Sequence, residues 1–266
     1  MSNSTNQAAA WYMSKSFHYG AASLATIALI WVLATSVFSL VGPQTLPSPF
    51  DVLERFSNLI LEPFAGAELQ GHALASLKRW SYGVLTAIAL GVPIGIFFAW
   101  APWFRAVVNP VFETLRYIPP FAWVPIAILW FGASTTTQAM VVFIAAFPAC
   151  VINAQLGVQH VDKILLQAAR VFGAGQMQTL RRVVVPVATP SIFTGVRIAI
   201  SNGWMALVGA ELVVGKTGLG FLIAQGQQND SVSTIFVGII SIGLLGVLID
   251  TLVQRLELVL MPWRRK

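Results

Sequence analysis

The stretch GVQHVDKILLQAARVFGAGQMQTLRRVVVPVATPS, residues 157–191, separates two strongly apolar runs of the chain. A connector between two helices needs only a few residues, so a segment of this length is expected to have a structure of its own. Apolar residues recur in it at three- and four-residue spacing, which predicts an amphipathic helix: Val161, Ile164, Leu165, Ala168, Ala169 and Phe172. Gly173 and Gly175 are expected to end this helix. A second short helix is expected over 176–184, ending before Pro186.

Two contact surfaces are compatible with this helix–glycine–helix element. Small residues at its bend would let a groove of another protein approach the backbone closely: Ala168, Ala169, Gly173 and Ala174. An amphipathic helix laid into a partner's groove is a common mode of recognition. The other reading is a helix that lies flat on a membrane surface. The residues of the stretch leave both readings open.

Outside this stretch the chain carries too little charge to be coated with water. Of its 266 residues, 56% are hydrophobic and 10% are charged, whereas a soluble domain has about 25% charged residues. The mean hydropathy is +0.75. These values predict an all-α integral membrane protein. The net charge of +6 does not indicate nucleic-acid binding, because the basic residues lie between apolar runs rather than on one face.

Six apolar stretches predict transmembrane helices: 22–41, 80–100, 118–132, 138–157, 192–214 and 235–256. The third is short and contains three prolines, so it is expected to face the protein interior, where freed backbone groups find partners. The first is too long for the apolar region of a signal peptide and is expected to remain as a span. The chain therefore divides into an N-terminal tail (1–21), a transmembrane domain (22–256) and a C-terminal tail (257–266).

The basic residues between the spans predict the orientation. If the N-terminus is cytoplasmic, ten basic residues fall inside: Lys15, Arg105, Arg116, Lys163, Arg170, Arg181, Arg182, Arg264, Arg265 and Lys266. Four fall outside: Arg55, Lys78, Arg79 and Lys216. The asymmetry places both termini in the cytoplasm. An external amphipathic helix is expected over 51–61, either lying on the bilayer or touching a soluble partner.

Several residues within the spans are candidates for a translocation path. A carboxylate at Glu211, near the outer end of the fifth span, either faces a cavity or gate, or pairs with Lys216 or a backbone amide. Asn202, Trp204 and Met205 either pack against another helix or line a cavity. Two prolines break the third span and either open half-helix ends toward an anionic solute or only shape the helix entry: Pro119 and Pro120. Asp250 is expected to snorkel or to pair with Arg255.

Several kinds of chemistry are disfavoured. The single cysteine, Cys150, allows no intramolecular disulfide, and the three histidines are scattered, so neither a metal site nor a catalytic site is expected. A phosphate-binding G-x-x-x-x-G-K-[S/T] motif does not occur, so any ATP-derived energy must come from another polypeptide. An ion-coupled secondary transporter remains the rival class, although midplane carboxylates and internal repeats are not evident. Because six spans rarely enclose a polar path, a two-fold dimer of this chain is expected.

The loop also resembles a known family. Gln167-Ala168-Ala169, then Gly173-Ala174, then Val185-Pro186 with Ala188 and Pro190, resembles the "EAA" loop of ABC-importer permeases. The family pattern is Glu-Ala-Ala, three residues, Gly, and a downstream Leu-Pro. The resemblance implies a coupling helix in which Gln167, Ala168, Ala169, Gly173 and Ala174 dock into a cleft of an ATP-binding subunit. Because Gln167 replaces the usual glutamate, a salt bridge at that position is not expected.

Three further stretches look like the nitrate/sulfonate/taurine/bicarbonate group of these permeases: Arg116–Gly132, Gly195–Glu211 and Gly218–Phe221. The resemblance covers roughly residues 45–260. It implies a type I importer fold in the bacterial inner membrane, two permease copies, two ATP-binding subunits and a periplasmic or lipid-anchored substrate-binding protein. It also implies a non-catalytic chain without a cofactor or metal of its own, since ATP and Mg would bind the ATPase. The expected solute is a sulfonate or taurine, with nitrate, bicarbonate, an aromatic acid or a vitamin precursor as alternatives.

Overall fold

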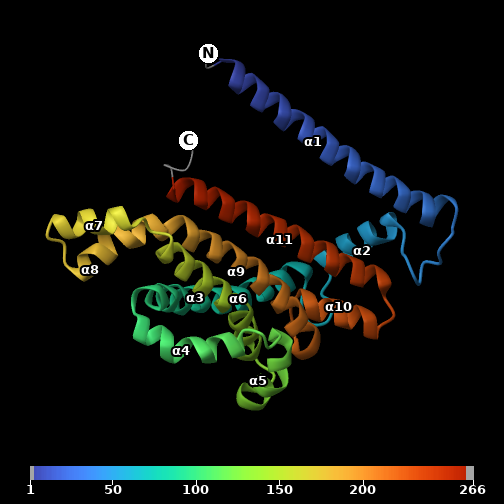
Figure 1. The fold of residues 1–266 in the computed structure, drawn as a ribbon. Helices are drawn as coiled ribbons and strands as arrows, with labels where there is room; N and C mark the ends of the chain where they lie inside the picture. Colours follow the sequence, from blue (N-terminus) through green and yellow to red (C-terminus); the bar gives the residue numbers. More distant parts are fainter. Residues whose placement is uncertain (1–2, 262–266) are drawn as a thin grey trace.

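The computed structural model describes residues 3–261, with side chains from His18 to Val259 and at Met261. This part of the chain is almost entirely helical (Figure 1). The α-helices are α1 (Asn3–Val32), α2 (Pro49–Leu61), α3 (Leu69–Trp100), α4 (Pro102–Leu115), α5 (Val124–Phe131), α6 (Thr135–Gln159), α7 (Lys163–Val171), α8 (Gln176–Thr179), α9 (Val185–Val214), α10 (Leu219–Gln228) and α11 (Val232–Leu260). A 3-10 turn, Pro120–Trp123, precedes α5, and π-helical turns occupy Leu33–Val37 and Leu180–Val184.

Within the described residues, five helical segments are long and apolar enough to cross a membrane: His18–Val37, Leu69–Trp100, Thr135–Gln159, Gln176–Val214 and Val232–Val259. The all-α membrane fold is confirmed. The stretch expected as a third span is instead a short apolar helical segment, Pro120–Phe131. Twelve residues extend only about 18 Å, less than the ~30 Å of a bilayer core. The helix cannot begin earlier because Pro119 holds an extended conformation before it.

Three boundaries differ from those expected. Helix α3 begins at Leu69 rather than near residue 80, so Lys78 and Arg79 lie within a helix and not in an external loop. The helix that begins at Gln176 does not end before Pro186 but continues to Val214. The π-helical turn Leu180–Val184 precedes Pro186, which then occupies the first turn of α9, where its missing N–H costs little. Helices α4 and α10 lie in stretches between the expected spans.

Both terminal segments that were expected to be tails are partly helical. The N-terminal tail, 1–21, is helical from Asn3 and continuous with the first span. Helix α11 extends to Leu260, into the expected C-terminal tail. The basic residues Arg264, Arg265 and Lys266 used for the orientation lie outside the described residues.

Small residues hold α3, α6 and α9 together in the centre of the bundle (Figure 1). Gly83, Gly91 and Gly95 on one face of α3 pack against α6, with the fully buried Ala87 between them. From α9, Gly195 packs against Ala149 and Asn153 of α6. Such close backbone approach at small residues is a common way for helices to associate in a membrane, where the hydrophobic effect supplies no attraction between them.

The two ends of the bundle are different. Figure 1 shows α7 and α8 projecting at one end, and α1 begins and α11 ends toward that same end. Helices α2 and α10 lie at the opposite end. Most of helix α1 stands away from the other helices, and its residues from His18 to Ile30 are exposed; its last turn contacts them, where Trp31 meets Phe236 of α11. The expected amphipathic helix over 51–61 is confirmed as α2, which begins with a capping box formed by Ser48 and Asp51.

We expect Gly95→Val to destabilise the bundle by about 1–3 kcal/mol or more, because overpacking a close helix contact forces the backbones apart. A Cβ at Gly95 would press on the carbonyl oxygen of Val151 and lie 2.8 Å from the Cβ of Ala154. Thermal unfolding in detergent measures the effect. Gly243→Val is the matched control, since a Cβ at Gly243 in α11 meets nothing within 4 Å. Equal unfolding midpoints for the two variants would contradict this account of the α3–α6 contact.

Candidate functional site: an exposed loop and a membrane cavity

Helices α7 and α8 form the expected helix–glycine–helix element. The Asp162 side chain caps α7 by accepting a hydrogen bond from the Ile164 N–H at 2.9 Å. The helix ends at Gly173, whose φ of +75° is a conformation that side-chain-bearing residues resist. The N–H of Ala174 then donates to the Ala169 carbonyl, which closes the turn. The sequence-based expectation for Gly173 is therefore confirmed.

Much of the apolar surface of this element is exposed. Val161 and Ala169 are buried, and Val161 and Leu166 pack against residues of the transmembrane helices. The remaining residues of the expected stripe are exposed: Ile164, Leu165, Ala168 and Phe172. Phe172 is 88% exposed and Val171 is 85% exposed. Of the five proposed coupling residues, Gln167, Ala168 and Gly173 are exposed, Ala174 is partly exposed and Ala169 is buried.

A cavity of about 700 Å³ lies among α3, α4, α6, α9 and the turn before α5. Aromatic and aliphatic side chains form most of its wall, including Phe98, Phe112, Phe121, Phe143 and Phe147. Polar groups are few in the lining. Arg116 is already paired with Glu113, at 2.7 Å, and lies over the Tyr117 ring. Asn202 is the other strongly polar lining residue among those described.

The candidate path residues separate into two groups. Pro120, Asn202 and Met205 line the cavity, and Pro119 directly precedes it as the residue before the 3-10 turn. Trp204 is buried on another side of α9, where its indole N–H donates to the Ile242 carbonyl and its ring meets Trp80 edge to face. The packing reading therefore holds for Trp204. A role in translocation for the cavity residues stays a prediction.

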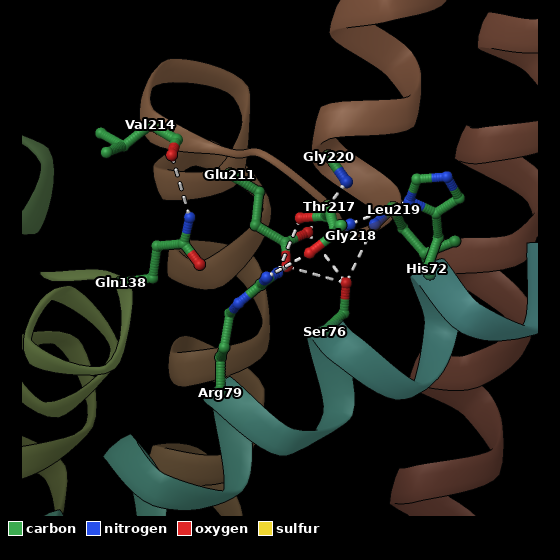
Figure 2. A network of polar contacts seen from close by, with 10 residues as sticks. All are labelled: His72, Ser76, Arg79, Gln138, Glu211, Val214, Thr217, Gly218, Leu219 and Gly220. Carbon is green, nitrogen blue, oxygen red and sulfur yellow. Dashed lines mark hydrogen bonds and ion pairs between the residues drawn. The ribbon is translucent and has the colours of Figure 1, made fainter. Parts of the chain in front are cut away.

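Glu211 lies away from this cavity, in a closed polar network (Figure 2). One of its oxygens accepts a hydrogen bond from Arg79 at 2.9 Å, and the other accepts one from the Gly220 N–H at 3.0 Å. The Ser76 hydroxyl lies 2.9 Å from both oxygens. The expected pairing with Lys216 is wrong, because Arg79 is the partner; pairing with a backbone amide is confirmed.

The same network holds the turn between α9 and α10 against α3. Arg79 also donates to the Thr217 carbonyl at 2.7 Å, and Ser76 accepts from the Leu219 N–H at 2.9 Å. His72 Nδ1 accepts from the Gly218 N–H, so its Nε2 carries the proton and donates to the Phe64 carbonyl. Four backbone groups of the turn, the Thr217 carbonyl and the three N–H groups that follow it, thus have side-chain partners, which fixes the turn in one position.

Sequence reasoning missed Ser76 and Arg79 because α3 was expected to begin near residue 80. A useful signal was present, since His72, Ser76 and Arg79 are spaced four and three residues apart and therefore share one helix face. The expected pair of Asp250 with Arg255 is also wrong. Asp250 of α11 instead pairs with Arg197 of α9, at 3.0 Å and 3.2 Å.

The chain is similar to known membrane transport proteins. The sequence model of one protein family, the binding-protein-dependent transport system inner membrane component, matches residues 91–262. A probable ABC transporter permease protein of Brucella abortus is 36% identical over 89% of this chain and 91% of its own length. The taurine transport system permease protein TauC of Escherichia coli is 31% identical over 95% and 92%. The nitrate import permease protein NrtB of a Synechocystis strain is 33% identical over 92% and 90%.

Among solved structures, the MetNI methionine ABC transporter in an inward-facing conformation is similar to this fold. The TM-score is 0.60 at 18% sequence identity, and the match covers 76% of this chain and 96% of the other. This similarity concerns the fold, which is that of a type I importer permease. The resemblance identified in the loop and the family comparison agree. The chain is a multi-pass membrane protein that belongs to the family of binding-protein-dependent transport system inner membrane components, the permease subunits of ABC transporters.

Proposed function

We propose that this chain is the membrane-spanning subunit of an ATP-driven, binding-protein-dependent importer for a small anionic solute, a sulfonate or taurine in the first place. Family membership and the exposed loop formed by α7 and α8 support this proposal. Relatives named for taurine, nitrate, bicarbonate and aliphatic sulfonates share 31–36% of their residues with the chain. The alternative solutes are therefore nitrate and bicarbonate, followed by aromatic acids and vitamin precursors.

The single observation that carries the proposal is the apolar tip of the loop. Val171 and Phe172 are among the most exposed apolar side chains of the described residues. They lie beside Gly173, at the end of the bundle from which α7 and α8 project (Figure 1). An ATP-binding subunit with an apolar groove would cover them. Two copies of that subunit would bind the ATP and Mg, and this chain would hydrolyse nothing.

The helical connection between loop and membrane suggests how ATP binding is transmitted. The segment from Gln176 to Val214 is one 39-residue helix in which a π-helical turn replaces a break. Its length is about 58 Å. It joins the loop at one end to the cavity residues Asn202 and Met205 and then to Glu211 at the other end. Closure of two ATP-binding subunits would displace both loops and rock the two permease copies between inward- and outward-open states.

The assembled importer would contain a second copy of this chain, two ATP-binding subunits and a periplasmic or lipid-anchored substrate-binding protein. The loop end of the bundle would face the cytoplasm of a bacterium, with both termini on that side, as the basic residues indicate. Five full spans are compatible with this, because α6 runs parallel to α3, and α4 and Pro120–Phe131 together lead the chain back between them. The substrate-binding protein would dock at the other end, which carries α2 and α10 (Figure 1).

Affinity purification from native membranes tests the proposal. We expect the tagged chain to retain an ATPase that carries a phosphate-binding loop, together with a solute-binding protein. Phe172→Glu is expected to reduce the retained ATPase at least several-fold, because burying a charge in an apolar groove is costly. Phe50→Glu is the matched control, since Phe50 is also exposed, at 64%, but lies on α2 at the opposite end.

Two results would contradict the proposal. One is purification of the chain without an ATPase, combined with uptake driven by an ion gradient, which would make it a secondary transporter. The other is an equal loss of the ATPase in Phe172→Glu and Phe50→Glu, which would show that the loop is not the docking surface.

A further inference from the structure

An ion pair within the membrane-spanning region is not explained by the packing of the bundle. Arg197 of α9 and Asp250 of α11 make two hydrogen bonds, from Nε to Oδ1 at 3.0 Å and from Nη2 to Oδ2 at 3.2 Å. The Gln254 amide also donates to Asp250, at 2.7 Å. The two charged side chains are nevertheless 39% and 41% exposed. The pair therefore lies at the surface of this chain.

The depth of this pair follows from contacts between helices. Gly195, two residues before Arg197, lies against Ala149 of α6, and the next residue of α6, Cys150, lies against Gly91 of α3. Arg197 is thus near the level of Gly91. From Gly91, α3 continues about 14 Å to Trp100 in one direction and about 16 Å to Trp80 in the other.

The apolar span that contains α3 ends at Trp100, and about 14 Å from that end is close to half the ~30 Å thickness of a bilayer core. The pair is consequently near the middle of the membrane. An Arg side chain alone could extend toward an interface. Here its head is held by the short side chain of Asp250, which has no such reach. Lipid cannot solvate a half-exposed charged pair at this depth, so the surface that carries it must face something polar.

The exposed face of α9 beside Arg197 is mixed: two of its residues are polar, and the apolar Ile198, which is 43% exposed, lies between them. Thr194 and Ser201 are exposed, three residues before and four residues after Arg197, and so they share its side of the helix. Asn202 and Met205 continue this face into the 700 Å³ cavity. The buried side of α9 carries only small and apolar residues at this level, including Gly195, Ala199 and Gly203. One continuous face thus connects the ion pair to the cavity.

The bonding of Arg197 leaves part of its guanidinium available. Nε and Nη2 are directed at Asp250, and no hydrogen bond among the described residues uses Nη1. Arginine presents its donors as a planar fork that matches carboxylates, sulfonates and phosphates. An acceptor such as a sulfonate oxygen could therefore bind at Nη1 while Asp250 keeps the other edge in place and offsets the charge when the site is empty.

We propose that Arg197 binds the anionic group of the solute at mid-membrane, in an aqueous path along α9 and α11. The wall of this path consists of the face of α9 that bears Thr194, Arg197 and Ser201, together with Asp250 and Gln254 of α11. This inference rests on the proposed import of an anion. It assigns to the permease itself a binding step for the charged group, in addition to any selection by a binding protein. The apolar cavity next to Asn202 would accommodate the uncharged part of the solute.

Cysteine accessibility in native membrane vesicles tests the inference without knowledge of the solute. Ser201→Cys in a Cys150→Ala background is treated with methanethiosulfonate reagents that carry a sulfonate or a quaternary ammonium group. Leu248→Cys is the control, since Leu248 is 52% exposed and two residues from Asp250, so it points to the other side of α11. We expect the cysteine at position 201 to react at least about tenfold faster than the one at 248, because water and ions concentrate in a polar path.

The charge preference tests Arg197 itself. With rates normalised to a free thiol, the sulfonate reagent should be favoured at position 201 about threefold, because the local field concentrates anions. Arg197→Gln should remove this preference, whereas Arg255→Gln, which deletes an exposed cation elsewhere on α11, should leave it unchanged. If Arg197→Gln does not accumulate, Asp250→Asn is measured instead and should raise the preference, because it removes the offsetting charge.

The outcomes separate this inference from the proposed function. Equal reactivity of cysteines at 201 and 248 would overturn the aqueous path along α9, and a preference that survives Arg197→Gln would overturn the role of Arg197. Neither result would affect the retention of an ATPase by the tagged chain. Loss of ATPase retention, in contrast, would remove the proposed function while leaving the accessibility result as it stands.

Discussion

We expect Glu211→Ala to destabilise the folded chain by about 3–5 kcal/mol, because it leaves a buried guanidinium without its carboxylate. Glu211 is fully buried, and the Arg79 side chain opposite it is only 10% exposed. The substitution also removes the acceptors for the Ser76 hydroxyl and the Gly220 N–H. Thermal unfolding of the purified chain in detergent should show a midpoint lower by roughly 10 °C.

The control for Glu211→Ala is Glu54→Ala, which removes an exposed carboxylate from α2 and should change the midpoint little. A second comparison distinguishes the unpaired charge from the lost volume. Replacing both partners with apolar residues, Arg79→Met together with Glu211→Leu, should recover part of the stability, since no charge then remains buried alone, while the Ser76 hydroxyl and the Gly220 N–H still lack an acceptor. A midpoint for Glu211→Ala equal to that of Glu54→Ala would show that the network contributes little to stability.

Glu211→Ala should also abolish uptake, because the network positions the end of the long helix that leads from the loop. The network fixes the turn between α9 and α10 onto α3 at the end of the bundle opposite the loop (Figures 1 and 2). The long helix from Gln176 to Val214 ends at this turn. With the turn released, displacement of the loop would move the end of that helix freely instead of rocking the whole bundle.

Gly173→Val is expected to reduce ATP-driven uptake at least about tenfold, because a β-branched residue resists the left-handed conformation at this position by more than the 1–2 kcal/mol of an ordinary residue. A Cβ at Gly173 meets nothing within 4 Å, so the effect comes from the backbone and not from a clash. The strained turn between α7 and α8 would re-aim Val171 and Phe172 and so weaken docking of the ATPase. Uptake into vesicles and the amount of co-purified ATPase measure the effect.

Gly175→Val is the matched control for Gly173→Val. Gly175 lies two residues away, a Cβ there also meets nothing within 4 Å, and its φ of −68° is one that valine adopts readily. We expect this variant to retain most of its uptake and its ATPase. If both variants lose activity equally, added bulk on the loop is responsible rather than the backbone conformation. If neither loses activity, the loop is not the coupling element.

The sequence by itself determined the class of the protein and the position of its loop. Long apolar runs with little charge are stable in a lipid bilayer as helices, because a helix satisfies its own backbone hydrogen bonds. Composition and apolar runs therefore predicted the fold class. The loop was equally readable, because Gly173 and the apolar spacing around it are local properties of neighbouring residues. For the same reason the amphipathic helix α2 was anticipated from a short stretch of chain, although its Ser48–Asp51 capping box was not.

Only the tertiary structure decided which polar residues meet. Arg79 and Glu211 are separated by 132 positions, and Arg197 and Asp250 by 53. The hydropathy of the sequence predicted that Arg79 lies outside the membrane, because hydropathy cannot show that a carboxylate far along the chain will pair with the charge. The predicted partners Lys216 and Arg255 were the basic residues nearest in sequence to the two carboxylates. Likewise Pro119 and Pro120 predicted that the third segment would be irregular. They did not predict that this segment would line a cavity beside Asn202 and Met205. Local patterns specify elements, whereas buried charges are stabilised by partners that packing brings together across the chain, and that information is not contained in any single stretch of sequence.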